Sequence, residues 1–243
     1  MRLFWVHFSA GVKATLREPA YLAFAVAFPA LFFLMFAAPL AQTQPAAGGR
    51  LLVAFTLYSV FVAVLSYFGI GQAQERALGF PRYRRTLPLP PLVPVLAQMG
   101  EALVLALLGV LALALAAGVG AGLHLPLRVW VRLLPVLGLG GTVFGLLGAA
   151  IGRALSPRGA SALANLLGLP LAYVGGLWVP PEGLPPAVAR LSPYTPTRLW
   201  AELAWSALSG KAGAPSLWAG LLAYGLLFLA LWALAQRLVQ ERA

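Results

Sequence analysis

The sequence contains no cysteine and few charged residues, and each shortage excludes a class of protein. Without cysteine the chain forms no disulfide bond and no thiolate metal site. Asp, Glu, Lys and Arg make up only 9% of its 243 residues, whereas soluble domains carry about 25%. A water-soluble fold of this length could not cover its surface with so few charges. The composition therefore excludes an ordinary soluble globular domain.

The motifs of common catalytic and nucleotide-binding sites are also missing. The only Gly-Lys pair, Gly210-Lys211, has Trp205 where a phosphate-binding loop needs its first glycine. There is no His-Glu-x-x-His and no Gly-x-Ser-x-Gly pattern, and the two histidines, His7 and His124, are far apart in the sequence. We therefore expect no catalytic residue, no metal site and no bound cofactor in this chain.

Long apolar runs dominate what is present. The chain is 61% hydrophobic, its mean hydropathy is +0.87, and runs of about 20 apolar residues are typical of membrane-spanning helices. We predict an all-α membrane protein, a single transmembrane domain over residues 1–243 with six transmembrane helices. The predicted spans are residues 20–40, 51–70, 93–122, 129–152, 160–179 and 217–235.

Proline and glycine predict local features within these spans. Pro29 lies inside the first span, where we expect a kink. Residues 41–50 form a short polar turn, and the second span is expected to end at Gly69 and Gly71. Small residues let helix backbones approach closely, so we expect the fourth span to pack in the interior or at a subunit interface. Its glycines are Gly138, Gly140, Gly141, Gly145 and Gly148.

Two segments outside the spans have a pattern of their own. Residues 1–18 carry an apolar stripe opposite a basic face, which predicts an amphipathic helix at the membrane interface and no cleaved signal peptide. Residues 180–213 are too rich in proline to span a membrane and too apolar for a free loop. There we expect a re-entrant or interfacial hairpin on the outer face, with short helices at Pro185–Leu191 and Pro196–Leu208.

The basic residues predict the orientation. A net charge of +11 would suggest nucleic-acid binding in a soluble protein. Here the cations are scattered between apolar spans, so we expect them to mark loops at a lipid bilayer and expect no nucleic-acid partner. Of the 17 Lys and Arg, 11 fall on one side and 6 on the other, the six being Arg50, Arg128, Arg132, Arg190, Arg198 and Lys211. This bias predicts a multi-pass membrane protein with both termini cytoplasmic, and we expect the membrane to be the bacterial inner membrane.

Three short patterns occur in an order that resembles a known family. The first span contains Phe28-Pro29. The loop after the second span contains Glu75-Arg76, Gly79, Arg84-Arg85 and Pro88-Leu89-Pro90, and the segment after the fifth contains Gly175-Gly176, Val179-Pro180, Leu184-Pro185 and Ser192-Pro193-Tyr194-Thr195-Pro196. With the six-span layout and the amphipathic helix ahead of it, these patterns resemble the membrane subunits of ABC-2 type transporters, the permease family of ATP-driven exporters.

The resemblance implies a subunit that is not catalytic by itself. Its partners would be a cytoplasmic ABC ATPase, which binds ATP and Mg²⁺, and a second permease subunit, identical or different. Residues 72–91 would form the coupling segment that docks on the ATPase, through Glu75, Arg76, Gly79, Phe80, Arg82, Tyr83, Arg84 and Arg85. The outer hairpin would act as a gate through Pro180, Leu184, Pro185, Pro193, Tyr194 and Pro196. Aromatic and glycine-rich spans favour an apolar or amphipathic substrate: a drug, a lipid or a lipid-linked glycan.

Two polar residues in the spans, Glu101 and Asn165, keep other hypotheses open as a possible substrate path. Carboxylates at membrane depth are functional candidates, so an ATP-independent secondary carrier that uses Glu101 is one alternative. Glu101 could equally be an interfacial residue that pairs with a nearby arginine. A non-transporting membrane scaffold is the third hypothesis.

Overall fold

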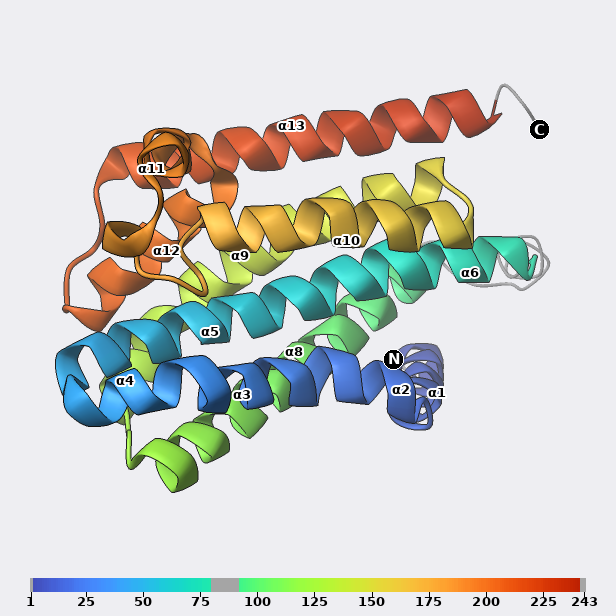
Figure 1. Cartoon of the computed structure of the whole chain (residues 1–243). Helices are drawn as coiled ribbons and strands as arrows, with labels where there is room; N and C mark the ends of the chain where they lie inside the picture. The colour runs from blue at the N-terminus through green and yellow to red at the C-terminus, as the bar shows by residue number, and fades with distance from the viewer. Residues whose placement is uncertain (1, 80–91, 241–243) are drawn as a thin grey trace.

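Helices account for all regular structure in the parts of the chain that the computed structural model describes, residues 2–79 and 92–240. Four described helices are long and apolar enough to cross a membrane: Ala47–Ala77, Leu96–Ala121, Leu127–Ala154 and Pro215–Leu238. The chain is therefore a multi-pass membrane protein. The long helices run between two ends of an elongated bundle (Figure 1). We call these the α6 end, where both chain termini lie, and the α12 end.

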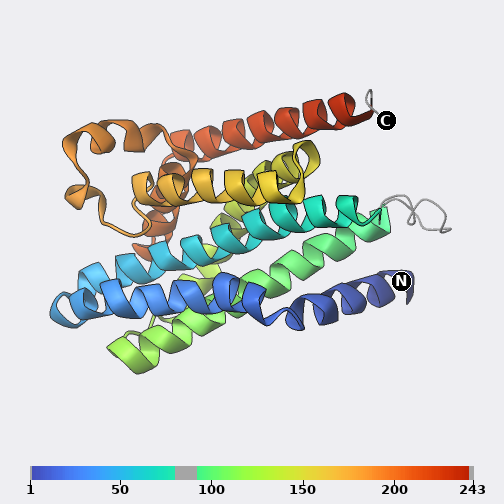
Figure 2. The same cartoon turned by 45° about the vertical axis from the view of Figure 1, so that its right-hand side comes forward.

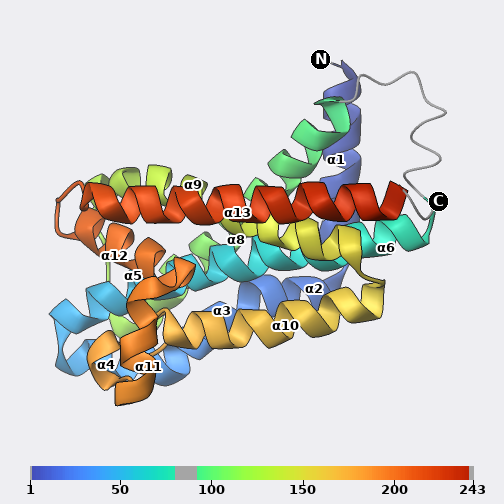
Figure 3. The ribbon, with the colours of Figure 1, turned by 90° about the horizontal axis from the view of Figure 1, so that it is seen from above.

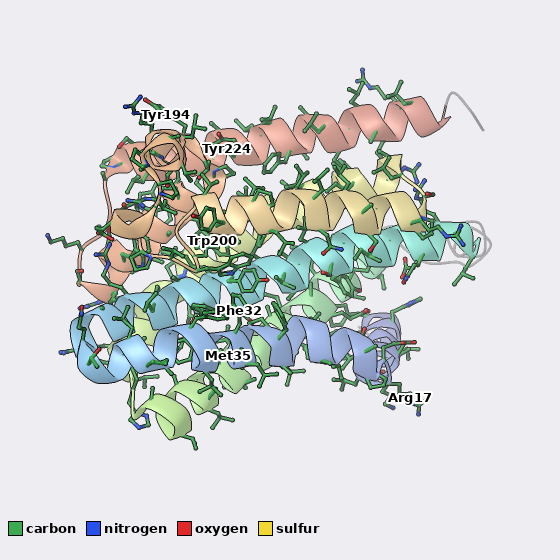
Figure 4. All side chains as sticks on the ribbon, viewed as in Figure 1. Arg17, Phe32, Met35, Tyr194, Trp200 and Tyr224 are labelled. Atoms are coloured by element: carbon green, nitrogen blue, oxygen red, sulfur yellow. The ribbon has the colours of Figure 1, made fainter. Side chains whose placement is uncertain are left out.

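The amphipathic N-terminal segment forms helix α1, Arg2–Leu16. It lies across the direction of the long helices, as Figure 3 shows from above. Phe8 packs against Gly100 of helix α8 (Leu92–Ala121), where an added Cβ would meet the phenyl ring at 2.9 Å. Lys13 and Arg17 are exposed, and Arg17 points away from the bundle (Figure 4). A helix with this orientation and this division of faces fits a position in the headgroup layer.

The first pass is a chain of short helical pieces interrupted by two π-helical segments. They are α2 (Pro19–Leu22), η1 (Ala23–Ala27), α3 (Phe28–Phe32), η2 (Phe33–Ala37) and α4 (Ala38–Thr43). η1 precedes Pro29 and η2 precedes Pro39. Proline cannot donate to the carbonyl four residues earlier and clashes with it, and a π turn accommodates this defect. Within this pass the apolar helical stretch is Ala25–Ala41, which is shorter than each of the four long apolar helices.

The second pass is longer than the sequence predicts, and the polar turn before it is much shorter. Helix α5 (Pro45–Ser66) starts directly after Gln44, with proline in its first turn, where the missing N–H costs nothing. The helix does not end at the two glycines near residue 70. It continues through η3 (Tyr67–Gly71) into α6 (Gln72–Ala77). Residues 72–77, predicted as loop, are therefore helical.

The remaining long helices lie close to their predicted bounds. They are α8 (Leu92–Ala121), α9 (Leu127–Ala154) and α13 (Pro215–Gln240). Helix α10 (Pro157–Val174) begins earlier than the predicted fifth span, because Ser156 caps it by accepting from the N–H of Gly159. It ends before the predicted residue 179, since Gly176 turns the chain with φ +78°. It is not among the four long apolar helices.

Between α10 and α13 the chain folds into short helices at the α12 end. They are η4 (Pro181–Gly183), α11 (Pro186–Leu191), η5 (Ser192–Tyr194) and α12 (Pro196–Leu208). The bounds of α12 agree with the sequence pattern, and Thr195 caps it by accepting from the N–H of Arg198. Figure 2 shows this segment projecting beside the ends of the long helices.

Helix α5 is the centre of the bundle. In its most apolar stretch 89% of the residues are buried, whereas the same share for α13 is 11%. In both Figures 1 and 2 α5 lies between α10 and the α3–α4 pass. Phe55 and Tyr58 of α5 pack edge-on against each other, and Trp178 packs against Tyr58. Trp200 of α12 is fully buried and donates to the Val136 carbonyl of α9 at 2.7 Å. α12 is thus anchored in the core.

Candidate functional site

The candidate coupling site is the described part of the predicted coupling segment, where α6 meets the end of α9. The last carbonyls of a helix have no partner within it. Arg76 supplies hydrogen-bond donors here. Its Nε donates to Gly152 O at 2.9 Å, and its Nη2 donates to Leu155 O, just after α9, at 2.5 Å. The C-terminal end of a helix also favours a positive charge. Arg76 therefore fastens α6 to the turn between α9 and α10.

A glycine contact continues this attachment along the two helices. A Cβ added to Gly152 would lie 2.4 Å from Phe68 O and 2.6 Å from Gly69 O. One on Gly148 would lie 3.1 Å from Leu65 O. Backbones can approach this closely only where the residue that faces the neighbouring helix has no side chain. The glycine-rich fourth span thus packs in the interior, one of the two placements that the sequence predicts.

Two glutamates at this end, Glu75 and Glu101, accept hydrogen bonds from neighbouring helical segments. Gln98 of α8 donates to the Glu75 carboxylate at 3.1 Å. Tyr67 of η3 donates to Glu101 of α8 at 2.6 Å. Helix α1 covers the Glu101 carboxylate, since a Cβ on Gly11 would lie 2.0 Å from its Oε1. Glu101 therefore lies where α1, α8 and η3 meet.

The tip of α6 is the exposed part of the site. Leu78, the residue that ends α6, is 77% exposed. Gly79 follows with φ +73°, a conformation that glycine adopts without strain, and turns the chain away from the helix. An exposed leucine at a helix end offers apolar area for a partner. The other predicted docking residues, Phe80, Arg82, Tyr83, Arg84 and Arg85, lie outside the described residues.

The predicted gate residues are distributed between the core and the surface of the α12 end. Leu184 and Pro196 are buried, and Pro180 is partly buried. Pro185 and Pro193 are exposed, and Tyr194 is 75% exposed. The Tyr194 carbonyl accepts from the Tyr224 hydroxyl of α13, and the two residues lie together in Figure 4.

An arrangement of charged and aromatic side chains at this end was not predicted. Arg50, at the start of α5, forms an ion pair with Glu182 at 3.4 Å. Its guanidinium lies 4.7 Å from the centre of the Trp205 ring, and Trp205 donates to the Arg50 carbonyl at 3.1 Å. Arg198 forms an ion pair with Glu202. These contacts tie α12 and η4 to the start of α5.

The two residues of the possible substrate path are not brought together. Asn165 of α10 is exposed and donates to Ser161 O at 3.0 Å. It borders a shallow pocket between α5 and α10, whereas Glu101 borders another between α1 and α8. The α5–α10 pocket is lined by Tyr58, Phe61, Val62, Leu65, Ser66, Ala164, Asn165, Gly168 and Leu169. Within the described ranges no group of three or more His, Asp or Glu side chains could hold a metal ion.

Sequence reasoning missed the structural role of Arg76. Because residues 72–91 were expected to lie in the loop after the second span, all their arginines were assigned to a partner. The spacing of Gly141, Gly145, Gly148 and Gly152 indicates one helix face that another backbone can approach. Helix-forming residues after Gly71 in turn indicate that the approaching helix extends to Arg76.

Comparison with known proteins identifies relatives over most of the chain. A family model described as "ABC-2 type transporter" matches residues 2–208. The curated protein "Putative transport permease YvfS" of Bacillus subtilis (strain 168) is 27% identical over 228 residues. These cover 91% of this chain and 92% of that protein.

Proposed function

The chain belongs to the ABC-2 type transporter family, and from this premise we propose that it is the membrane subunit of an ATP-driven exporter. Members of this family are transmembrane components of transporters and are not catalytic by themselves. The chain would then act with an ABC ATPase that binds ATP and Mg²⁺. A second permease subunit would complete the substrate path.

The observation that carries the docking proposal is the exposed tip of α6. This tip directly continues the most buried helix of the bundle. Within it Glu75 and Arg76 bind α8 and α9, which leaves Leu78 as the exposed apolar group. We assign docking to Leu78 together with Phe80, Tyr83 and the three arginines of residues 82–85. Glu75, Arg76 and Gly79 then position the segment.

The contacts at α6 support a route for motion into the membrane. Arg76 binds both the last turn of α9 and the residue that follows it. A displacement of the coupling segment would therefore move α6 and the α9–α10 turn together, relative to the buried helix α5. For ATP to drive transport, the ATPase must hold the segment differently in two states. The shallow pocket between α5 and α10 then changes shape, because α10 follows the same turn.

The proposal includes six spans with the α6 end in the cytoplasm. Two of these, the α2–α4 pass and α10, have proline inside them and are not among the four long apolar helices. Proline is tolerated in membrane helices where neighbours satisfy the freed backbone groups. The larger number of cations on the α6 side supports the orientation. The short helices at the α12 end would then form the outer hairpin and gate.

The test is co-purification with an ABC ATPase, sought first in the reading frames that neighbour the one for this chain. We expect Leu78→Asp to weaken the complex by about tenfold, because burying a new charge at an apolar contact costs at least 1–2 kcal/mol. Charge reversal of Arg82, Arg84 and Arg85 to Glu is expected to abolish it. Leu127→Asp is the matched control, since Leu127 has the same 77% exposure at the opposite end. It is expected to bind the ATPase like the native chain.

Three outcomes would count against the proposal. Unchanged ATPase association in both the Leu78 and the arginine variants would show that docking lies elsewhere. Equal loss in the Leu127 control would show a general loss of folded protein. Transport that needs no ATPase, depends on a proton gradient and is lost in Glu101→Gln would instead identify a secondary carrier.

A further inference from the structure

The α12 end carries more positive charge than its acidic residues can balance. Of the acidic residues in the described ranges, Glu182 and Glu202 lie at this end. Both are engaged, Glu182 with Arg50 and Glu202 with Arg198. Four further cations, Arg128, Arg132, Arg190 and Lys211, are exposed at this end and have no acidic partner among the described residues. Cations are disfavoured on the outer side of a membrane protein, so this surplus calls for an explanation.

Three of these cations form one cluster. Arg128 and Arg132 are four residues apart in the first turns of α9, so they lie on one face of that helix. The Arg132 guanidinium reaches the turn between α12 and α13: a Cβ on Gly210 would lie 3.0 Å from its Nη1. Lys211 is the next residue of that turn. We call Arg128, Arg132 and Lys211 the α9 cation cluster. Arg190 lies apart from it, on α11.

The turn that carries Lys211 has a defined shape. The backbone N–H of Lys211 donates to Ser206 O at 2.8 Å. Trp218 donates to Ala212 O at 2.9 Å, which holds the far side of the turn. Gly210 and Gly213 have φ values of +79° and +76°, as the turn requires. The cation is therefore presented from a fixed backbone beside the Arg132 guanidinium.

The depth of the cluster matches a lipid headgroup. Arg132 lies about 6 Å further along α9 than Arg128, at 1.5 Å per residue. Val131 and Pro135, on the same face of α9 as the two arginines, are exposed apolar side chains, as expected of a helix that faces lipid. Arg132 extends from this apolar surface toward the polar turn at Gly210, as long basic side chains do at a membrane interface. The cluster thus combines apolar surface below with positive charge above.

From this arrangement we infer that the α9 cation cluster binds the anionic headgroup of an amphiphile, with its acyl chains along the apolar surface of α9. The bound amphiphile is the class of molecule that the transporter would release into the outer leaflet. This role as a release site rests on the proposed function, whereas the binding itself does not. The substrate class narrows accordingly from apolar or amphipathic molecules to lipids with a phosphate or another negative headgroup.

The experiment measures lipid binding by the purified full-length chain in a neutral detergent. The probe is a fluorescent phosphatidylglycerol, and a phosphatidylcholine with the same chains is the zwitterionic reference. Each Lys or Arg near an anionic surface contributes about 1 kcal/mol. We therefore expect Arg128→Gln and Lys211→Gln each to lower the preference for phosphatidylglycerol about fivefold, and the triple Gln variant to lower it more than tenfold.

Matched variants separate a specific site from overall charge. Arg190→Gln removes an exposed cation outside the cluster and is expected to change the preference less than twofold. Arg128→Lys with Arg132→Lys keeps the charge and is expected to keep the preference. An unchanged preference in the triple variant, or an equal loss in Arg190→Gln, would overturn the inference. Displacement of the probe by millimolar inorganic phosphate would identify a free-anion site and overturn the lipid assignment.

A second arm distinguishes this inference from the proposed function. The complex with the ATPase is reconstituted in vesicles, and ATP hydrolysis is measured with and without phosphatidylglycerol. We expect stimulation by the anionic lipid in the native complex and its loss in the triple Gln variant. Specific lipid binding without any ATPase association would refute the proposed function but support the lipid site. ATP-driven transport with an unaltered lipid preference in the triple variant would support the proposed function but refute the lipid site.

Discussion

Gly152→Ala should separate the two helices that we propose to move together. The added Cβ would lie 2.4 Å from Phe68 O and 2.6 Å from Gly69 O, whereas ordinary contact starts at 3.4 Å. The backbones must therefore part by 1.0 Å (3.4 minus 2.4) at the first of these atoms. Both obstructing atoms belong to backbone, which cannot rotate away as a side chain can.

The expected loss in unfolding free energy is about 1–3 kcal/mol, the usual cost of overpacking a well-packed interior. A shift of this size also lengthens the 2.9 Å hydrogen bond from Arg76 to Gly152 O, so association between α6 and α9 should weaken as well. Gly138→Ala is the matched control on the same helix, because an added Cβ there meets nothing within 4 Å. Alanine is the better helix former by about 1 kcal/mol, so the control should be as stable as the native chain or more so.

The assay is reversible unfolding of the purified full chain in mixed micelles, followed by the fluorescence of its seven tryptophans. In the ATPase complex, the same variants are compared for transport per ATP hydrolysed. We expect this ratio to fall in Gly152→Ala and to stay constant in Gly138→Ala. If Gly152→Ala unfolds at the same denaturant concentration as Gly138→Ala, the close backbone contact is wrong and so is the proposed route for motion.

Three further predictions concern single contacts, each checked in the same unfolding assay. Arg76→Gln should lower the unfolding free energy by about 1–2 kcal/mol, since hydrogen bonds from a charged donor are lost at a partly buried site; no loss would show that the α9 carbonyls do not need it. Gly140→Ala should cost about 1–3 kcal/mol, because its Cβ would lie 2.0 Å from the buried Trp200 ring, and native-like stability would contradict that packing. Glu182→Gln should change stability by less than about 1 kcal/mol, because its pair with Arg50 is exposed, and a larger loss would mean that the pair is shielded from solvent.

Patterns with a local cause were predicted well from the sequence. α12 begins at Pro196 because proline suits the first turn of a helix and Thr195 can cap it. α1 follows from its apolar stripe. Both depend on residues within one helix, so no knowledge of the neighbours was needed.

Features that depend on neighbours were not predicted. Helix α5 continues past Gly69 and Gly71 because α9 packs against it there, whereas glycine alone suggests an end. Arg76 was predicted to contact the ATPase together with the other arginines of the loop. Its hydrogen-bond acceptors in the fold lie 76 and 79 residues away in the sequence. The Arg50–Trp205 contact likewise joins residues 155 positions apart. The local sequence around each residue does not indicate which distant residue it will contact.

The π-helical segment η3 determines the angular position of the docking tip. A π turn contains one more residue than an α turn, and one residue corresponds to about 100° of rotation on a helix with 3.6 residues per turn. Leu78 therefore points in a direction different by that angle from the one an unbroken α-helix would give it. Together with release of the Arg76 hydrogen bonds to Gly152 and Leu155, a switch of η3 to α-helical hydrogen bonding would turn Leu78 about the helix axis while α5 kept its place in the core. The central helix thus contains a point of rotation between a fixed core and a turnable contact.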